Sequence, residues 1–330
     1  MSKPRKVLFD TDPGIDDAMA LRLIQRSPAL DLVGITSVFG NAPIEITTRN
    51  ARHLAARFGI DAPVAQGAGA PLAMPRLPQP VHVHGENGLG NVDLGGFALT
   101  PLHQLPAAEF IVETIRAHPG EVSLIAVAPL TNLALALEIA PDIADKIDEV
   151  IIMGGAFGHG PRRGNVTPVA EANVINDPHA ADRVLTADWP VTMIGLDVTM
   201  RCILSTARAA EIAARGGPIE AFLAEIARPY SALYAANYGI DGCCLHDVGA
   251  VACAIDPGLF GYSSGPIRVV TDGIATGQTI QRQEGQRFPP GDWDGFRAQK
   301  VAVEVDNEAV VTLFMAEILN SDTKDNALSN

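Results

Sequence analysis

Cysteine, aromatic residues and long apolar runs are all scarce in this 330-residue sequence. Its four cysteines show no C-x-x-C spacing, so neither a disulfide framework nor a zinc site is expected. No stretch reaches the roughly 18 consecutive apolar residues that a membrane-spanning helix needs. The N-terminal MSKPRKVLFD passes directly into a strand-like run, which is unlike a secretory leader. A reducing cytoplasm is therefore the expected location.

Positive charge is also in short supply. Lys and Arg number 24 against 38 Asp and Glu, which gives a formal net charge of -14. Nucleic acid and anionic membranes would be repelled, so neither is expected as a partner, whereas a neutral small molecule is unaffected by this field. Hydrophobic residues make up 47% and charged residues 19%, which excludes a disordered chain and indicates a sizeable core.

Short apolar runs alternate with segments of helical periodicity along the chain. Strands are predicted at residues 6–9, 31–37, 121–127, 148–153 and 190–196. Helices are predicted at 16–26, 43–58, 106–118, 130–139 and 177–187, with additional consecutive helices over 205–240. This α/β alternation is typical of a single open, mostly parallel, Rossmann-like sheet with helices on both faces.

No linker divides the chain convincingly, so we expect one catalytic domain over residues 1–320 and a flexible tail over 321–330. Residues 66–96 are rich in Pro and Gly and contain VHVHGENGLGN, a composition typical of a lid or binding loop. In parallel sheets, ligands bind beyond the carboxyl ends of the strands. Polar segments that follow the apolar runs are therefore candidate functional residues: 10–17, 41, 127–132 and 154–173.

Four carboxylates lie within eight residues at the end of the first predicted strand. In VLFDTDPGIDDAMAL, Asp10 and Asp12 end the strand, and Asp16 and Asp17 open the next helix. These groups repel one another unless a cation lies between them, and such oxygen ligands suit calcium or magnesium. The helix dipole favours acidic residues in a first turn, but this does not explain Asp10 and Asp12 at a buried strand end. The spacing does not fit an EF-hand. We therefore predict a divalent metal site.

A strand ending in D-x-D also resembles the haloacid dehalogenase-like phosphatases, which are magnesium enzymes with an aspartate nucleophile. Here Pro13 follows the second aspartate, and the pair Asp16-Asp17 comes at once. The later acidic motif LHDVGA, at Asp247, lacks the paired carboxylates that such phosphatases use. This phosphatase remains the alternative interpretation.

The motif D-T-D-P-G-I-D-D resembles the signature of the inosine-uridine-preferring nucleoside hydrolases. FGNAPIE, HGENGLGN, APLTNLALAL, IIMGGAF, AEANVINDPHAA, GLDVT and LHDVGA resemble further blocks of this family, in family order, over roughly residues 5–256. Several spaced motifs in the correct order are more specific than any one of them. The resemblance implies calcium-dependent hydrolysis of pyrimidine or inosine-type ribonucleosides to ribose and free base. It also implies a role in nucleoside salvage and a homodimer or homotetramer.

The resemblance also implies a set of calcium ligands. Asp12, Asp17 and Asp247 match its carboxylate ligands, and the carbonyl oxygen of Val127 matches a backbone ligand. Asp12 would also act as general base toward the attacking water, which the metal binds. Asp10 is expected behind these ligands. A catalytically silent ribose- or nucleoside-binding protein is a second alternative, against which the intact Asp12 argues.

The resemblance further implies a ring of polar side chains around the ribose. Asp16 matches the residue that holds the 2′-hydroxyl, with Asn41 nearby and Asn173 toward the 2′/3′ side. Asn165 and Glu171 match the residues that hold the 5′-hydroxyl. Carboxylate and amide oxygens around the sugar would stabilise an oxocarbenium-like transition state. Met153 matches an apolar residue of the wall around the sugar, and core packing is its other interpretation.

On the side of the nucleobase, His246 resembles the family histidine that acts as general acid toward the leaving base. His84 resembles a second histidine at the pocket mouth, with a structural hydrogen bond as its other interpretation. Tyr234 and Tyr238 share one face at helical spacing and are candidates for base contact or for core packing. Ala172 stands where some relatives carry an aromatic residue, which weakens any argument for base stacking. The sequence does not decide between purine and pyrimidine ribosides.

Overall fold

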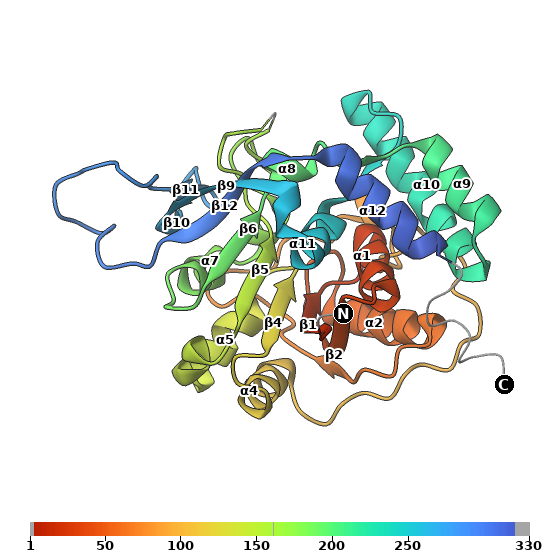
Figure 1. The fold of residues 1–330 in the computed structure, drawn as a ribbon, viewed down its shortest axis with the longest axis horizontal. Coiled ribbons are helices and arrows are strands. Elements are labelled where there is room, and N and C mark those ends of the chain that lie inside the picture. The colour runs from red at the N-terminus through yellow and green to blue at the C-terminus, as the bar shows by residue number, and fades with distance from the viewer. Residues whose placement is uncertain (1–2, 161, 321–330) are drawn as a thin grey trace.

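The predicted apolar runs form the centre of an eight-stranded sheet in the computed structural model, which describes residues 3–160 and 162–320 (Figure 1). The strand order is β3-β2-β1-β4-β5-β6-β12-β9, and every neighbouring pair is parallel except β12 and β9. The strands are β1 (Arg5–Thr11), β2 (Leu30–Ser37), β3 (Val64–Gln66), β4 (Val122–Ala126), β5 (Glu149–Met153), β6 (Val191–Ile194), β9 (Phe260–Gly265) and β12 (Gln299–Val305). The predicted fold class is confirmed.

Two small antiparallel pairs and the helices complete the described chain. The pairs are β7 (Ile203–Leu204) with β8 (Cys243–Cys244), and β10 (Ile267–Val269) with β11 (Thr279–Gln281). The α-helices are α1 (Ile15–Arg26), α2 (Ile44–Phe58), α3 (Val81–His84), α4 (Ala107–Ala117), α5 (Thr131–Ile139), α6 (Ala172–Asn176), α7 (Pro178–Leu185), α8 (Leu196–Thr199), α9 (Thr206–Arg215), α10 (Pro218–Tyr238), α11 (His246–Ile255) and α12 (Asn307–Leu319). The 3-10 helices are η1 (Pro141–Asp145) and η2 (Pro257–Leu259).

The central strands are buried on both faces because alternate side chains point into two different cores. In β1, Val7 and Phe9 belong to one core, and Leu8 belongs to the other. In β5, Ile151 and Val150 divide in the same way. Helices α1, α2, α10, α11 and α12 cover the first face, and α4, α5 and α7 cover the second (Figure 1).

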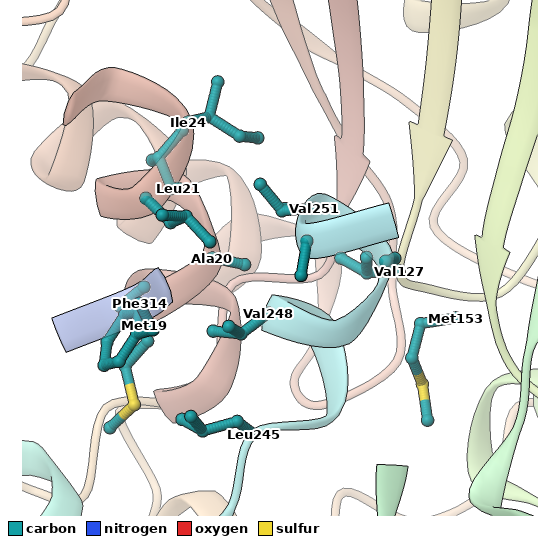
Figure 2. Close-up of a cluster of buried hydrophobic side chains, with 14 of the residues drawn as sticks. Met19, Ala20, Leu21, Ile24, Val127, Met153, Leu245, Val248, Val251 and Phe314 are labelled. Carbon is teal, nitrogen blue, oxygen red and sulfur yellow. The ribbon is translucent and has the colours of Figure 1, made fainter. Parts of the chain in front are cut away.

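Helix α1 is almost wholly buried between α11 and α12, and this burial fixes the direction in which its first turn points. Figure 2 shows side chains of the three helices packed together, including Met19, Leu21, Val248, Val251 and Phe314. Both α1 and α11 begin with aspartates in their first turns. The core therefore holds two acidic helix starts at fixed positions relative to each other.

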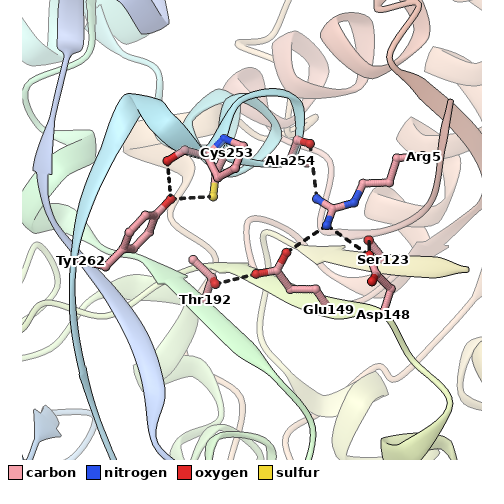
Figure 3. A network of polar contacts seen from close by, with 9 residues as sticks. Arg5, Ser123, Asp148, Glu149, Thr192, Cys253, Ala254 and Tyr262 are labelled. Carbon is pink, nitrogen blue, oxygen red and sulfur yellow. Dashed lines mark hydrogen bonds and ion pairs between the residues drawn. The ribbon is translucent and has the colours of Figure 1, made fainter. Parts of the chain in front are cut away.

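The amino ends of the strands carry a polar network of a different kind (Figure 3). Arg5, at the start of β1, pairs with Asp148 and Glu149 at 3.1 Å each. Glu149 also accepts a hydrogen bond from Thr192 at 2.7 Å, and Asp148 accepts one from Ser123 at 2.8 Å. Each acidic group here has a cationic partner, so this network ties the sheet edge together.

The predicted helix and strand limits agree with the structure to within about three residues. The strands after residue 256 were not predicted. For β9 the reason lies in its sequence, FGYSSG, whose Gly and Ser residues give no apolar run. Residues 66–96 are irregular apart from the end of β3 and the short α3. The predicted tail at 321–330 lies outside the described residues. Across the described chain, none of the helices has the length and apolarity to span a membrane.

Candidate active site

The first acidic segment turns sharply between β1 and α1 because its own side chains hold the turn. Asp17 accepts hydrogen bonds from the Gly14 amide at 2.9 Å and from the Thr11 hydroxyl at 2.5 Å. The carboxylate thereby joins the strand end to the first turn of the helix. Asp16, its neighbour in that turn, faces the cavity described below.

Three carboxylates from two helices converge at the carboxyl ends of the parallel strands. Asp16 and Asp17 of α1 and Asp247 of α11 each present an oxygen, and these oxygens lie within 4.8 Å of one another. All three side chains are buried. Among residues 3–160 and 162–320, no Lys or Arg side chain forms an ion pair with them. A compact set of buried oxygen donors without a protein cation fits a hard divalent cation such as calcium or magnesium.

Asp12 lies beside this set and is oriented by Asn41. Its carboxylate accepts the Asn41 backbone amide at 2.7 Å and the Asn41 side-chain amide at 3.2 Å. The same side-chain amide reaches Asp17 at 3.2 Å, so Asn41 links the two carboxylates. A Cβ at Gly40 would lie 1.9 Å from an Asp12 oxygen, so only glycine leaves room for this orientation. Asp16, which the resemblance places near the ribose, lines the cavity described below and also belongs to the convergent set.

Burial raises the pKa of all these carboxyl groups, and mutual repulsion adds to the effect. The pKa of Asp12 lies well above its usual value because of burial and the nearby Asp17. The pKa values of Asp16 and Asp247 are raised well above the usual range for the same two reasons, burial first and a neighbouring carboxylate second. Burial also raises the pKa of Asp17. A cation among these groups would favour their charged forms.

Asp10 lies behind the convergent set, against the sheet. One carboxylate oxygen accepts hydrogen bonds from Thr36 at 2.5 Å and Asn132 at 2.7 Å, and the other is buried with no hydrogen-bond partner among the described residues. Burial raises the pKa of Asp10 to about 7. Its backbone oxygen accepts the Val127 amide at 2.9 Å, which places the end of β4 against the end of β1. Asn132 lies in the predicted functional segment 127–132, but its contact with Asp10 was not predicted, because the two residues are 122 apart in sequence.

A cavity of about 540 Å³ lies next to the convergent aspartates. It is lined by every residue predicted to bind substrate, together with His246, Val127 and Asp247. Asp10, Asp12 and Asp17 lie below its surface and do not line it. The nine predicted binding residues along its wall are Asp16, Asn41, His84, Met153, Asn165, Glu171, Asn173, Tyr234 and Tyr238.

Hydrogen bonds hold the polar groups on one wall of this cavity. Glu171 caps α6 and accepts the backbone amides of Asn173 at 2.8 Å and Gly155 at 2.9 Å. Burial raises the pKa of Glu171, and these amide donors oppose the increase. The Asn173 side-chain amide donates to the carbonyl oxygens of Val127 at 3.0 Å and Met153 at 3.1 Å. Val127, a predicted metal ligand through its carbonyl, therefore lines the cavity with that carbonyl bound to the Asn173 amide.

Aromatic and hydroxyl groups surround His246 on the opposite wall. Its Nδ1 lies 2.7 Å from the Thr199 hydroxyl, and its Nε2 lies 2.6 Å from the Tyr234 hydroxyl. The Tyr230 hydroxyl is 3.4 Å from that of Tyr234. Burial lowers the pKa of His246 to about 4. Tyr230 and Thr199 were not predicted, although Tyr230 shares the four-residue spacing of Tyr234 and Thr199 closes the GLDVT motif.

His84 has both of the roles considered for it. It lines the cavity, and its Nδ1 accepts the Ile15 backbone amide at the start of α1 at 3.3 Å. Its ring is tilted against that of Tyr230, with 5.7 Å between centroids. Burial lowers the pKa of His84 to about 3, so it serves as a neutral acceptor. The hydrogen bond joins the loop over residues 66–96 to the acidic helix.

Comparisons with known proteins are consistent across the whole chain. The profile of the family "Inosine-uridine preferring nucleoside hydrolase" matches residues 7–312. Uridine nucleosidase 1 of Arabidopsis thaliana is 37% identical over 97% of this chain and 94% of its own length. The inosine-uridine preferring nucleoside hydrolase of Leishmania major is 38% identical over 84% of this chain and 87% of its own. The solved plant nucleoside hydrolase PpNRh1 superposes with a TM-score of 0.90 at 35% identity, covering 96% of this chain and 99% of that one.

Proposed function

Because this chain belongs to the inosine-uridine preferring nucleoside hydrolases, and is thus a hydrolase acting on N-glycosyl bonds, we propose that it cleaves ribonucleosides with a bound calcium ion. The products would be ribose and the free pyrimidine or purine base, for nucleoside salvage. The observation that carries this proposal is the convergence of Asp16, Asp17 and Asp247 within 4.8 Å beneath a cavity lined by amide and carboxyl groups.

The donor set favours calcium over magnesium. Asp12, Asp17 and Asp247 would hold the ion through their carboxylates, with the Val127 carbonyl as a backbone ligand. Calcium accepts irregular oxygen geometry and carbonyl ligands, whereas magnesium demands a near-octahedral set and retains several waters. When bound, the ion supplies a positive charge that lowers the pKa of a coordinated water.

Asp12 is the proposed general base. Two hydrogen bonds from Asn41 fix its carboxylate beside the convergent set, so its direction does not depend on the substrate. A bound cation would favour the charged form of Asp12, which is the form that accepts a proton. Asp12 therefore has the position and the charge state to take the proton of an attacking water.

Stabilisation of the transition state falls to the polar wall. Cleavage of an N-glycosidic bond builds positive charge on the ribosyl ring. Asp16, Glu171 and Asn41 line the cavity, and hydrogen bonds hold the side chains of Glu171 and Asn41 in place before substrate arrives. Fixed negative and dipolar groups stabilise this developing charge more than the neutral ground state, which lowers the barrier.

Replacing His246 with alanine tests its role toward the leaving base. Uridine and inosine release a poor leaving group, so the loss of a general acid should lower kcat by about 10²- to 10⁴-fold. p-Nitrophenyl riboside needs no acid and should lose only a few-fold, as measured by the absorbance of nitrophenolate. His118→Ala, at the end of α4, is the matched control. Equal losses on the natural and the activated substrate would remove the leaving-group role of His246.

A substrate panel tests the proposed activity itself. The protein is incubated with uridine, inosine and an aryl phosphate, with and without a chelator, and reducing sugar and phosphate are measured. Release of ribose that the chelator abolishes is expected. Phosphate release without ribose would favour the phosphatase alternative, and binding of nucleoside without either product would favour the silent binding protein.

The remaining properties stay predictions. A single domain ending near residue 320, a homodimer or homotetramer, and a cytoplasmic location all follow from the sequence interpretation. Sedimentation analysis of the purified protein measures the assembly directly.

A further inference from the structure

We propose that Arg162 is a positioning residue, which stacks on Tyr238 and fixes the base-side end of the cavity. The inference rests on the proposed function. Arg162 then affects the binding of the substrate rather than the cleavage of the bond.

The segment that carries Arg162 is anchored where it leaves the sheet. Asp197, the buried residue just after β6, accepts the backbone amides of Phe157 at 2.7 Å, His159 at 2.6 Å and Gly160 at 2.9 Å. A Cβ at Gly160 would lie 2.4 Å from the Asp197 backbone, so the two chains are in close contact. A buried carboxylate with three amide donors holds this segment firmly.

The segment is anchored again a few residues later. Asn165 accepts the Ala172 amide through its side chain at 3.0 Å, and its own backbone amide donates to the Ala170 carbonyl at 3.2 Å. Asn165 also lines the cavity on the proposed 5′-hydroxyl side. Arg162 therefore lies between two fixed points, which limits where its side chain can reach.

From this position the guanidinium meets Tyr238. The guanidinium carbon lies 4.2 Å from the centroid of the Tyr238 ring, within the range of a cation–π contact. Tyr238 is the last residue of α10, where helices fray, and it lines the cavity. Its ring centroid is 5.3 Å from that of Tyr234, whose hydroxyl contacts His246.

Two consequences follow from this contact. One face of the Tyr238 ring is occupied by the guanidinium, so the ring keeps its orientation toward the cavity. The contact also joins the ribose-side segment to α10, which carries the base-side aromatic residues, and so sets the width of the cavity between them. Loss of Arg162 should weaken the binding of the substrate and of the transition state to the same extent, because the proposal gives neither Arg162 nor Tyr238 a contact with the reacting bond.

Arg162→Ala, Arg163→Ala and Arg162→Lys are compared with the wild-type protein on uridine in saturating calcium. Arg162→Ala should raise KM by about 3- to 10-fold, the fold-change that corresponds to an exposed or partly desolvated cation–π contact, with kcat within about twofold of wild type. Arg162→Lys should recover part of the loss, because an ammonium also binds a ring face but lacks the planar stacking surface. Arg163→Ala removes the same charge from the same segment, where Arg163 lies against Gly158, and should behave as wild type.

A double-mutant cycle identifies the partner. In a Tyr238→Ala background, Arg162→Ala should change KM by less than about twofold, because the contact is already lost. An unchanged KM in Arg162→Ala, an equal loss in Arg163→Ala, or an undiminished effect in the Tyr238→Ala background would each overturn the inference. A wild-type protein inactive on all ribonucleosides would instead overturn the proposed function, and the inference with it.

Discussion

Replacing Asp12 with alanine is expected to lower kcat on uridine and inosine by about 10²- to 10⁴-fold, the contribution of a positioned general base. Asn41 fixes the Asp12 carboxylate beside the convergent aspartates, and the substrate itself offers no group that could act as the base in its place. The p-nitrophenyl riboside should lose activity to a similar degree, because an activated leaving group still needs a nucleophilic water. This pattern separates Asp12 from His246, whose loss should spare the activated substrate.

The fold should survive this substitution. Alanine leaves two amide donors of Asn41 without their acceptor, at a cost of about 1–3 kcal/mol, but it also removes a buried carboxylate repelled by Asp17. Thermal unfolding should therefore shift by only a few degrees. Asp31→Ala, at the exposed start of β2, removes one acidic residue far from the cavity and serves as the control. Turnover by the Asp12 variant close to that of wild type would refute the proposed mechanism.

Removing divalent cations is expected to abolish turnover and to lower stability, and added calcium should restore both. A ligand that binds only the folded state at 100 times its Kd stabilises by about 2.7 kcal/mol. Differential scanning calorimetry with chelator and with calcium measures this shift. Asp247→Asn removes one charged ligand of the proposed set and should therefore abolish most of the calcium-induced shift.

The calcium effect should grow as pH rises. Burial raises the folded-state pKa of Asp12, Asp16 and Asp247 well above the value of about 4 that an unfolded carboxyl has, and that of Asp10 to about 7. Without a cation, the folded chain holds protons that the unfolded chain releases, so this contribution to stability is complete below about pH 4 and is lost as pH rises through the folded values. Calcium replaces the protons. A calcium-induced shift that is the same at pH 5 and pH 8 would contradict this linkage.

The part of the site that lies within one short segment was predictable from the residues alone. Asp10, Asp12, Asp16 and Asp17 are separated by a single turn, and the repulsion among four carboxylates indicates a cation without knowledge of the fold. The carboxyl ends of parallel strands added the expectation that these groups face a ligand. Asp247 could be assigned only by resemblance, because nothing local indicates that α11 brings it beside α1.

The part of the site that depends on long-range contacts was not predictable in this way. Thr199 contacts His246 from α8, and Tyr230 contacts Tyr234 on α10; the 47 residues between Thr199 and His246 carry no information about their distance in space. That Asn41 orients the Asp12 carboxylate through its backbone and side-chain amides also depends on the folded chain, because 29 residues separate the two in sequence. In the fold, the antiparallel edge strand β9 escaped prediction for a local reason, since its Gly and Ser residues hide the strand pattern, whereas the alternation in β12, QKVAVEV, was overlooked.

The central claim is that Asp12 and Asp17, together with Asp247 and the Val127 carbonyl, hold one calcium ion at the carboxyl edge of the sheet. A crystal structure of the protein grown with calcium, with the ion identified by its anomalous scattering, measures this directly. We expect one ion per chain beneath the cavity, with Asp12, Asp17, Asp247 and the Val127 carbonyl as its ligands. Carboxylates that stay apart with no ion between them, in crystals saturated with calcium, would contradict the claim.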